Sequence, residues 1–193
     1  MTSDFEGKSY LTADNWHPVL PVADYQRRPI QYLEIGVFYG ANLISVARTY
    51  AAHPDSKLYA IDPWCDYENY HEYVGELDRI YQAFLRNLDK SGQRSKVLVR
   101  RAHAHQILPY LPNDFFDLIY IDGNHQKEHV LEDAVLAFRK LKPTGILIFD
   151  DYIWPYSDDV SQTVMAFINC YQSKLTVLGP HNNQMFIRKN SSM

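Results

Sequence analysis

The sequence predicts a doubly wound α/β fold with a mostly parallel, seven-stranded sheet. Short apolar runs typical of buried strands alternate along the chain with segments whose apolar residues recur at helical spacing. The last two apolar runs flank a stretch of turn residues, which is typical of a hairpin. Because strands that alternate with helices form parallel βαβ units, we expect helices on both faces of a parallel sheet that an antiparallel hairpin closes.

The first three strands are expected where apolar residues cluster, and Gly36 ends the first of them. Each strand is followed by a segment of helical periodicity, with Leu43, Ile44 and Ala47 on one side of the first helix. Pro112 stops the third helix, because proline cannot continue a helix. The expected strands cover residues 30–35, 57–61 and 96–99, and the expected helices cover residues 41–52, 68–88 and 105–111.

The alternation continues through the second half of the chain. A helix with apolar positions at Val130, Ala134 and Phe138 is followed by a turn at residues 142–145, whose glycine opens the fifth strand. Residues 179–183 supply the turn of the closing hairpin. The expected strands cover residues 116–121, 146–149, 175–178 and 184–188, and the expected helices cover residues 127–141 and 160–171.

Chain length indicates a single domain, since 193 residues are enough to build one core. Residues 1–29 are rich in turn formers and contain three prolines. We therefore expect an N-terminal arm or cap at residues 1–29, followed by one domain over residues 30–193. Such an arm could support a homo-oligomer.

Charge and apolar patterning exclude several classes of function. The formal net charge is −4, whereas general nucleic-acid binders carry a basic excess, so we expect no nucleic-acid partner. No stretch approaches the ~20 apolar residues of a membrane span, and the acidic N-terminus indicates no signal peptide. Cys65 and Cys170 suggest neither a disulfide framework nor a zinc site. We expect a cytoplasmic protein without a membrane partner.

A cofactor site is predicted where the first two strands end. Gly36 and Gly40 let the backbone turn tightly and approach a ligand, although a plain strand-to-helix turn is the alternative. Their spacing differs from Gly-x-Gly-x-x-Gly, which disfavours a dinucleotide pyrophosphate. Asp62 ends the second strand, and its carboxylate can accept hydrogen bonds from both hydroxyls of a ribose. A solvated acid at a strand end is the alternative interpretation of Asp62.

Three further positions extend the predicted cofactor site toward a base. Pro63 and Trp64 follow Asp62 and could form an apolar wall for an adenine ring, or Trp64 could pack in the core. The loop after the third strand contains Ala102 and His103 and passes near the adenine edge in this layout. His103 contacts the base or is a surface residue.

A metal site is predicted where the fourth and fifth strands end. Asp122 follows one strand, and Asp150 and Asp151 follow the other, so their carboxylates should converge. Because like charges repel, three carboxylates need a cation or protons to coexist. Oxygen ligands suit Mg²⁺, which would lower the pKa of a substrate hydroxyl, while solvated acids at the rim are the alternative. His125 lies near Asp122 and is a candidate general base or cofactor contact.

Four motifs, in order over about residues 30–152, resemble class I S-adenosylmethionine (SAM)-dependent methyltransferases. More narrowly, they resemble the branch that includes macrocin-type sugar O-methyltransferases and, more distantly, catechol O-methyltransferase. The motifs are Glu34-Ile35-Gly36-x-x-x-Gly40, Tyr59-Ala60-Ile61-Asp62-Pro63-Trp64, Tyr120-Ile121-Asp122-Gly123-x-His125 and Leu141-Lys142-Pro143-x-Gly145-Ile146-x-Ile148-x-Asp150-Asp151-Tyr152.

The resemblance implies a Rossmann-like methyltransferase fold that binds SAM. It implies that Glu34, Gly36 and Gly40 line the amino-acid end of the cofactor and that Asp62 holds the ribose. Asp122 is expected at both the cofactor and the reaction centre, as a catalytic residue beside His125.

Metal-dependent members of the branch bind Mg²⁺ through acids that match Asp122, Asp150 and Asp151. Some sugar-modifying relatives use an acid as the general base at the position that matches Asn124. Asparagine cannot take that role, so His125 becomes the candidate general base here. Ala102 stands in a loop that often carries glycine and serine in the family, which removes a possible serine contact with the cofactor.

The predicted activity is methyl transfer from SAM to a hydroxyl of a small molecule, such as a sugar or an aromatic natural product. The tyrosine-rich segment 67–81 and the N-terminal arm are the candidate substrate lid. Two other classes remain open: a protein that binds SAM or another nucleotide without catalysis, and a nicotinamide-dependent oxidoreductase. The glycine spacing disfavours the oxidoreductase.

Overall fold

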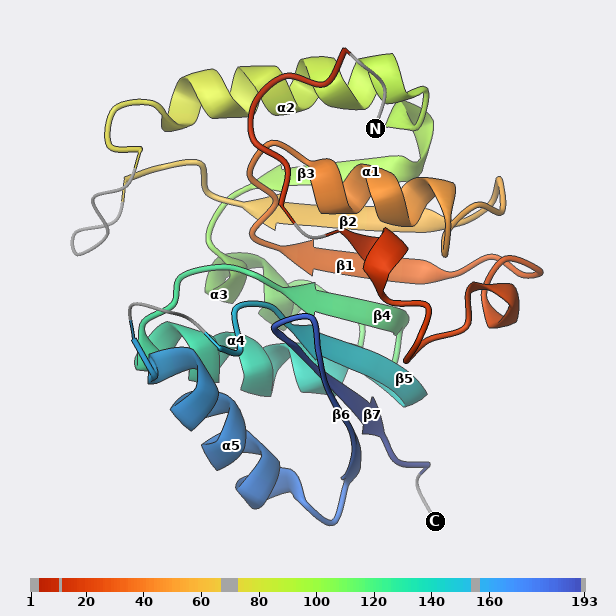
Figure 1. Cartoon of the computed structure of the whole chain (residues 1–193), viewed down its shortest axis with the longest axis vertical. Helices are drawn as coiled ribbons and strands as arrows, with labels where there is room; N and C mark the ends of the chain where they lie inside the picture. The colour runs from red at the N-terminus through yellow and green to blue at the C-terminus, as the bar shows by residue number, and fades with distance from the viewer. Residues whose placement is uncertain (1–3, 11, 67–72, 154–156, 192–193) are drawn as a thin grey trace.

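The computed structural model describes residues 4–10, 12–66, 73–153 and 157–191, and its sheet confirms the predicted doubly wound α/β fold. Within these residues, seven strands lie in the order β3-β2-β1-β4-β5-β7-β6 (Figure 1). Strands β1 to β5 pair in parallel, and β7 pairs antiparallel with β5 and β6. The strands are β1 (Gln31–Ile35), β2 (Lys57–Asp62), β3 (Val97–Arg101), β4 (Phe116–Ile121), β5 (Leu141–Phe149), β6 (Leu175–His181) and β7 (Gln184–Lys189).

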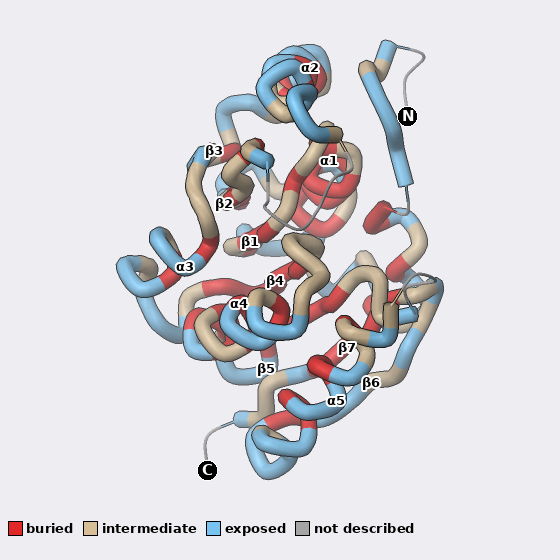
Figure 2. Tube along the Cα trace, turned by 90° about the vertical axis from the view of Figure 1, so that its left-hand side faces the viewer, coloured by how far each residue is buried: buried red, intermediate tan, exposed pale blue. Residues whose placement is uncertain are grey.

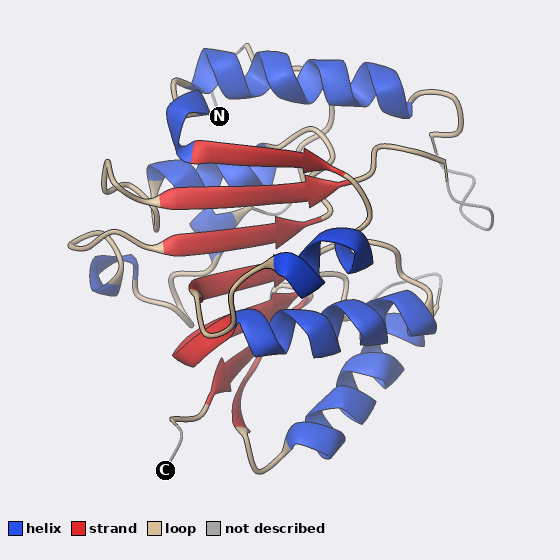
Figure 3. Cartoon of the chain, turned by 180° about the vertical axis from the view of Figure 1, so that it is seen from behind, coloured by secondary structure: helices blue, strands red, loops and turns tan. Residues whose placement is uncertain are grey.

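Helices cover both faces of the sheet, as the alternating pattern predicts. One face packs against α1 (Ala41–Arg48) and α2 (Leu77–Ser91). The other face packs against α3 (Ala104–Ile107), α4 (Lys127–Lys140) and α5 (Asp159–Tyr171), which lie in front of the strands in Figure 3. Within the described ranges, no helix combines the length and the apolar character that a membrane crossing requires.

The order of the strands reverses between β1 and β4. Strand β1 pairs with β2 on one side and with β4 on the other, and all three run in parallel. Their carboxyl ends therefore meet at one edge of the sheet, where ligands bind in open α/β folds. The register aligns Ile35 with both Ile61 and Ile121, so the residues that follow these strands are neighbours.

The core consists of two apolar clusters, one on each face of the sheet. All six residues of β4 are buried, because helices cover the strand on both faces. Each large apolar side chain that such a strand buries stabilises the fold by roughly 1.5–3 kcal/mol. Buried segments of the tube concentrate in the strands and on the inner sides of the helices (Figure 2). The sheet therefore gives the site at its edge a rigid base.

The N-terminal segment contributes to the core through two short 3₁₀ helices, Ala13–Asn15 and Val22–Asp24. Trp16 is fully buried and contacts the rings of Tyr50, Tyr120 and Phe186. Its indole Nε1–H donates a hydrogen bond to Gln184 Oε1 at 2.8 Å. Burial of this large ring holds the segment against the sheet.

Two predicted boundaries need correction. The described part of α2 begins at Leu77 and not at residue 68, and residues 67–72 lie outside the described residues. Strand β5 begins at Leu141, directly after α4, because Leu141 pairs with Phe116. The predicted turn at residues 142–145 is a bulge within that strand, and pairing resumes between Ile146 and Leu118.

The closing hairpin has a tighter turn than the five residues predicted for it. Strands β6 and β7 extend to His181 and Gln184, which leaves Asn182 and Asn183 as the turn. Both asparagines have positive φ angles, 47° and 65°, as a type I′ hairpin turn requires. Asparagine tolerates this conformation better than most residues, so a two-residue turn is possible without glycine.

Candidate functional site

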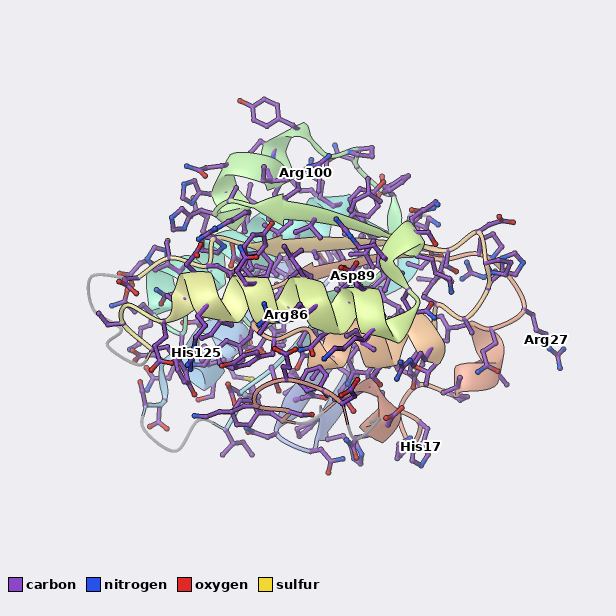
Figure 4. The ribbon with its side chains drawn as sticks, turned by 90° about the horizontal axis from the view of Figure 1, so that it is seen from above. His17, Arg27, Arg86, Asp89, Arg100 and His125 are labelled. Atoms are coloured by element: carbon purple, nitrogen blue, oxygen red, sulfur yellow. The ribbon has the colours of Figure 1, made fainter. Side chains whose placement is uncertain are left out.

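A cavity of about 630 Å³ opens at the carboxyl ends of the parallel strands. His125 lies at this end of the molecule, and His17 and Arg27 lie at the opposite end (Figure 4). The predicted site residues that line the cavity are Glu34, Gly36, Asp62, Pro63, His103, Asp122, His125, Asp150 and Asp151. Gly40 and Ala102, also predicted for the cofactor site, are not among the residues that line it.

Gly36 occupies a position where only glycine fits. Its φ angle is +79°, and a Cβ atom there would lie 1.8 Å from the carbonyl oxygen of Asp122. The loop after β1 therefore passes directly against the loop after β4. This contact brings the predicted cofactor end and the predicted reaction end into one cavity.

Glu34 lies at the base of the cavity with only 1% of its surface exposed. Tyr32 donates its hydroxyl to Glu34 Oε2, and Asn42 Nδ2 donates to the same oxygen at 2.9 Å. Burial raises the pKa of Glu34 to about 8. The carboxyl group is thus held in place by protein donors, and its charge is not compensated by a cation in these contacts.

Asp62 organises the loops after β1 and β2 through three backbone hydrogen bonds. Its Oδ2 accepts the amides of Val37 at 2.8 Å and Phe38 at 3.0 Å, and its Oδ1 accepts the amide of Trp64 at 2.7 Å. Burial nevertheless raises its pKa. A carboxylate offers about four acceptor positions, so one position remains on Oδ1. Asp62 can therefore accept one strong hydrogen bond from a ribose, and not a separate bond on each oxygen.

Trp64 is a core residue that also borders the cavity. Its ring stacks on Phe84 at 5.0 Å and packs against Tyr81 at 4.7 Å, with 1% of its surface exposed. Gly40 belongs to the same packing, because a Cβ atom there would lie 2.6 Å from the Phe84 ring. The packing of α2 on α1 accounts for this glycine.

His103 is the N-cap residue of α3 and forms the capping box of that helix with Gln106. Its Nε2 lies 3.7 Å from the sulfur of Cys65, and its ring stacks on His105. Burial lowers the pKa of His103, which favours the neutral imidazole. The neighbouring Ala102 donates its amide to the carbonyl oxygen of Asp62 at 3.2 Å and so joins the ends of β2 and β3.

Asp122, His125 and Asp151 converge beyond β4 and β5. His125 Nε2 lies 3.7 Å from Asp122 Oδ1 and 3.4 Å from Asp151 Oδ2. Candidate ligand atoms of the three side chains all lie within 4.8 Å of one another. Burial and neighbouring carboxylates raise the pKa of Asp122 well above its usual range and that of Asp151 to about 6. Carboxylates held this close need a cation or protons to coexist.

Asp150, the third predicted metal ligand, is engaged elsewhere. Its Oδ2 accepts the Tyr120 hydroxyl at 2.5 Å, and its Oδ1 accepts Gln184 Nε2 at 3.1 Å. Gln184 is in turn held by Trp16. Both oxygens of Asp150 thus accept hydrogen bonds at the cavity, and the side chains whose candidate ligand atoms lie within 4.8 Å of one another are Asp122, His125 and Asp151.

A second set of cavity residues comes from the N-terminal strap (residues 4–10), which belongs to the arm that the sequence analysis proposed as part of a substrate lid. The strap is fixed to α2, because the Glu6 backbone exchanges two hydrogen bonds with the Asn87 amide, at 2.8 and 2.9 Å. Arg86, labelled on α2 in Figure 4, makes a bidentate ion pair with the Glu6 carboxylate. Lys8 and Tyr10 consequently reach the cavity.

The mouth of the cavity beneath the strap is aromatic. Lys8 Nζ donates to the Tyr73 hydroxyl at 2.5 Å, and Tyr10 stacks on Phe38 at 6.5 Å. Tyr73 also packs against Phe38, with ring centroids 5.0 Å apart. Of the predicted lid segment, Tyr67 and Tyr70 lie outside the described residues.

The hairpin turn of β6 and β7 supplies one further residue that the sequence did not suggest. Asn183 Nδ2 donates to Asp151 Oδ1 at 3.3 Å, and Asn183 Oδ1 accepts the amide of Ile153 at 2.6 Å. Asn183 therefore fixes the segment after β5 and orients Asp151. No local sequence pattern predicts the contact between Asn183 and Asp151, which are 32 positions apart.

Comparison with known protein families gives one match that covers most of the chain. Residues 33–152 match the family described as methyltransferase domain. These residues include most of β1, all of β2 to β5, and the ends of β1, β2, β4 and β5 that line the cavity.

One curated relative is an uncharacterized protein of Acanthamoeba polyphaga mimivirus. It is 26% identical over 131 residues, which cover 66% of this chain and 54% of the relative. This chain thus spans about half the length of the curated relative that it matches.

Two solved structures illustrate the similarity of the fold. The O-methyltransferase TomG of Streptomyces achromogenes, involved in tomaymycin synthesis and solved with SAM, matches with a TM-score of 0.68 and 19% identity over 94% of this chain and 82% of TomG. A putative O-methyltransferase of Klebsiella pneumoniae matches with a TM-score of 0.69 and 22% identity over 96% of this chain and 84% of the other. At these identities the likeness demonstrates a shared fold.

Proposed function

This chain belongs to the methyltransferase domain family, and from that premise we propose that it transfers a methyl group from SAM to a hydroxyl of a small molecule. One observation carries the proposal: a single cavity joins Glu34, Gly36 and Asp62 to the cluster of Asp122, His125 and Asp151. The first group suits a nucleoside with a charged amino-acid tail. The second suits the deprotonation of an acceptor.

The residues at the ends of β1 and β2 fit SAM. Gly36 allows the backbone to approach a ligand closely, and Asp62 keeps one acceptor position for a ribose hydroxyl. The buried carboxyl of Glu34 suits the cationic amino-acid end of SAM, because a positive charge favours the ionised form of the carboxyl. In this proposal Pro63 and His103 border the nucleoside.

The cluster beyond β4 and β5 fits a divalent cation. Two carboxylates and an imidazole nitrogen within 4.8 Å are a suitable donor set, and burial and neighbouring carboxylates raise the pKa of Asp122 and Asp151, which a cation would lower. Asp122, Asp151 and His125 would hold the ion. When bound, Mg²⁺ or a similar cation lowers the pKa of an acceptor hydroxyl. The nitrogen ligand favours Mn²⁺ over Mg²⁺ relative to a site of three carboxylates.

The reaction breaks the bond between the sulfonium and the methyl carbon and forms a bond from the acceptor oxygen to that carbon. The hydroxyl proton must leave, and the cluster provides two ways to remove it. With a cation, Asp122, Asp151 and His125 would hold it beside the acceptor, where it would lower the pKa of the hydroxyl so that the proton leaves to solvent. Without one, His125 Nε2 accepts the proton, and the two aspartates stabilise the imidazolium, which lies 3.4 Å from Asp151 and 3.7 Å from Asp122.

The aromatic mouth beneath the strap is the proposed acceptor site. Sugars and aromatic rings pack well against aromatic faces, which Phe38, Tyr10 and Tyr73 supply here. The proposed acceptor is therefore a sugar or an aromatic natural product. We propose a cytoplasmic location from the composition and from the free thiols of Cys65 and Cys170.

The proposal is tested by loading the purified chain with SAM and measuring methyl transfer to a panel of sugars and catechols. Activity is expected to fall at least 100-fold in Asp122→Asn, which removes one charge of the cluster. Glu128→Gln removes an exposed charge from α4 and serves as the matched control. A wild-type chain that binds SAM but methylates none of the acceptors would favour the binding protein without catalysis.

A metal titration separates the two uses of His125. Mn²⁺ binding, followed by electron paramagnetic resonance, is expected to be saturable in the wild type and lost in Asp151→Asn. If chelators leave the activity unchanged, His125 is the base and the cation is not required.

A further inference from the structure

A buried carboxyl group faces the cavity from α4 and has no role in the mechanism above. Asp133 lines the cavity with 8% of its surface exposed. Within the described part of the chain, no hydrogen bond or ion pair engages its carboxylate. Buried acids are ordinarily paired, because an unpaired polar group away from water is costly. Burial accordingly raises the pKa of Asp133 to about 7.

The position of Asp133 places it on the α3 and α4 side of the cavity. A Cβ atom on Gly123 would lie 3.3 Å from Asp133 Oδ2 and 3.6 Å from the Ile35 side chain, so the carboxyl lies against the loop after β4. Ile35, Ile61 and Ala104 form the apolar cluster on this face and also line the cavity. The aromatic mouth lies on the other face of the sheet, with α1 and α2.

These surroundings suit a flat ring with a hydrogen-bond donor on one edge. Ile35, Ile61 and Ala104 supply apolar walls, and the cavity lining also includes the imidazoles of His103, His105 and His129. A ribose at Asp62 would lie beside this region, because Asp62 pairs with Arg101 at the end of β3 and Ala104 follows that strand. A carboxyl group at the far wall then meets the edge of the base.

We propose that Asp133 recognises the 6-amino group of the adenine ring of SAM. This inference rests on the proposed function and adds to it the residue that selects the base. A carboxylate oxygen of Asp133 accepts an N–H of the amino group. Glycine at position 123 provides the room that this carboxyl requires.

The test compares two ligands that differ at one group. S-adenosylhomocysteine carries the 6-amino group, and its deaminated form, S-inosylhomocysteine, carries an oxygen there and a proton on N1. Each is titrated calorimetrically into the wild type and into Asp133→Asn and Glu132→Gln. Glu132 is the adjacent acid at the cavity rim and is exposed, so it is the matched control for lost charge.

The wild type is expected to bind the adenine ligand at least about tenfold more tightly than the inosine ligand, because a carboxylate repels the oxygen at position 6. Asp133→Asn should reduce this preference about tenfold, since an amide can also donate to that oxygen. Glu132→Gln should keep the wild-type preference.

Two other outcomes would overturn the inference, and they differ in what they say of the proposed function. If Asp133→Asn binds S-adenosylhomocysteine and keeps the full preference, Asp133 does not recognise the base and the proposed function stands. If the folded wild type binds neither ligand, the proposed function fails as well. Urea denaturation of each variant verifies that it is folded.

Discussion

The two ends of the cavity hold carboxyl groups in opposite ways. At the ends of β1 and β2, protein donors satisfy the acids: Asp62 accepts three backbone amides, and Glu34 accepts Tyr32 and Asn42. At the ends of β4 and β5, Asp122 and Asp151 face each other across His125.

This difference shows which part of the site is complete without a ligand. Donors that the fold supplies keep Glu34 and Asp62 in one geometry and give the cavity a fixed shape. The carboxyl groups of Asp122 and Asp151 instead lie close to each other, and burial together with neighbouring carboxylates raises the pKa of both, so they favour a cation or a proton. The rigid end of the cavity, with Glu34 and Asp62, thus serves binding. The reactive end, with Asp122 and Asp151, lies next to it and serves the chemistry.

The largest effect is expected from Gly36→Ala, which would break the contact between the two ends. The new Cβ atom would lie 1.8 Å from the Asp122 carbonyl oxygen, at a φ angle of +79°. We expect a loss of unfolding free energy on the order of 4 kcal/mol or more, measured by urea denaturation. Gly92→Ala has a similar φ of +73° with open space around it and should cost about 1 kcal/mol. Equal losses in both variants would argue against the close contact.

The rigid end is tested by Asp62→Ala. This change leaves the amides of Val37, Phe38 and Trp64 without their acceptor. We expect a loss of about 3 kcal/mol in unfolding free energy, together with the loss of SAM binding. A variant as stable as the wild type would show that Asp62 does not organise the loop after β1.

The pH dependence of stability tests the burial of Glu34. Its pKa is raised from 4.5 to about 8, so between these values the folded chain retains a proton that the unfolded chain has released. Unfolding free energy should therefore fall as pH rises, with a contribution of up to about 1.4 kcal/mol per pH unit from this group. Glu34→Gln removes that contribution, so its stability should decline less between about pH 5 and pH 8. Parallel curves for the two proteins would contradict the assignment.

The smallest change in stability is expected at the reactive end. Asp122→Asn removes repulsion among the carboxylates, so the metal-free variant should be as stable as the wild type or more stable by up to about 1 kcal/mol. If Asp122→Asn lost as much unfolding free energy as Asp62→Ala, the proposed difference between the two ends would be wrong.

Sequence patterns predicted the strands of the site well, because strands buried on both faces are continuous apolar runs. The central strand was expected at residues 116–121 and is observed at Phe116–Ile121. The start of β5 was missed, because the bulge at residues 142–145 contains the proline and glycine of an ordinary turn. Local composition cannot distinguish a turn, which ends a strand, from a bulge, after which the same strand continues.

The composition of the candidate site was only partly predictable. Strand ends identified Asp62, Asp122 and Asp151, since parallel strands place their carboxyl ends together. The engagement of Asp150 depends on Gln184 and on Trp16, which is 168 residues away from Gln184. Contacts of this range leave no local signal in the sequence, so the hydrogen bonds of Asp150 could not be predicted.

Calorimetric titration of the folded, cofactor-free chain with SAM tests the central claim most directly. The account predicts saturable binding of one SAM per chain, its loss in Asp62→Ala with folding verified, and no loss in the exposed control Glu128→Gln. A folded wild-type chain that binds no SAM, with or without Mg²⁺ or Mn²⁺, would contradict it.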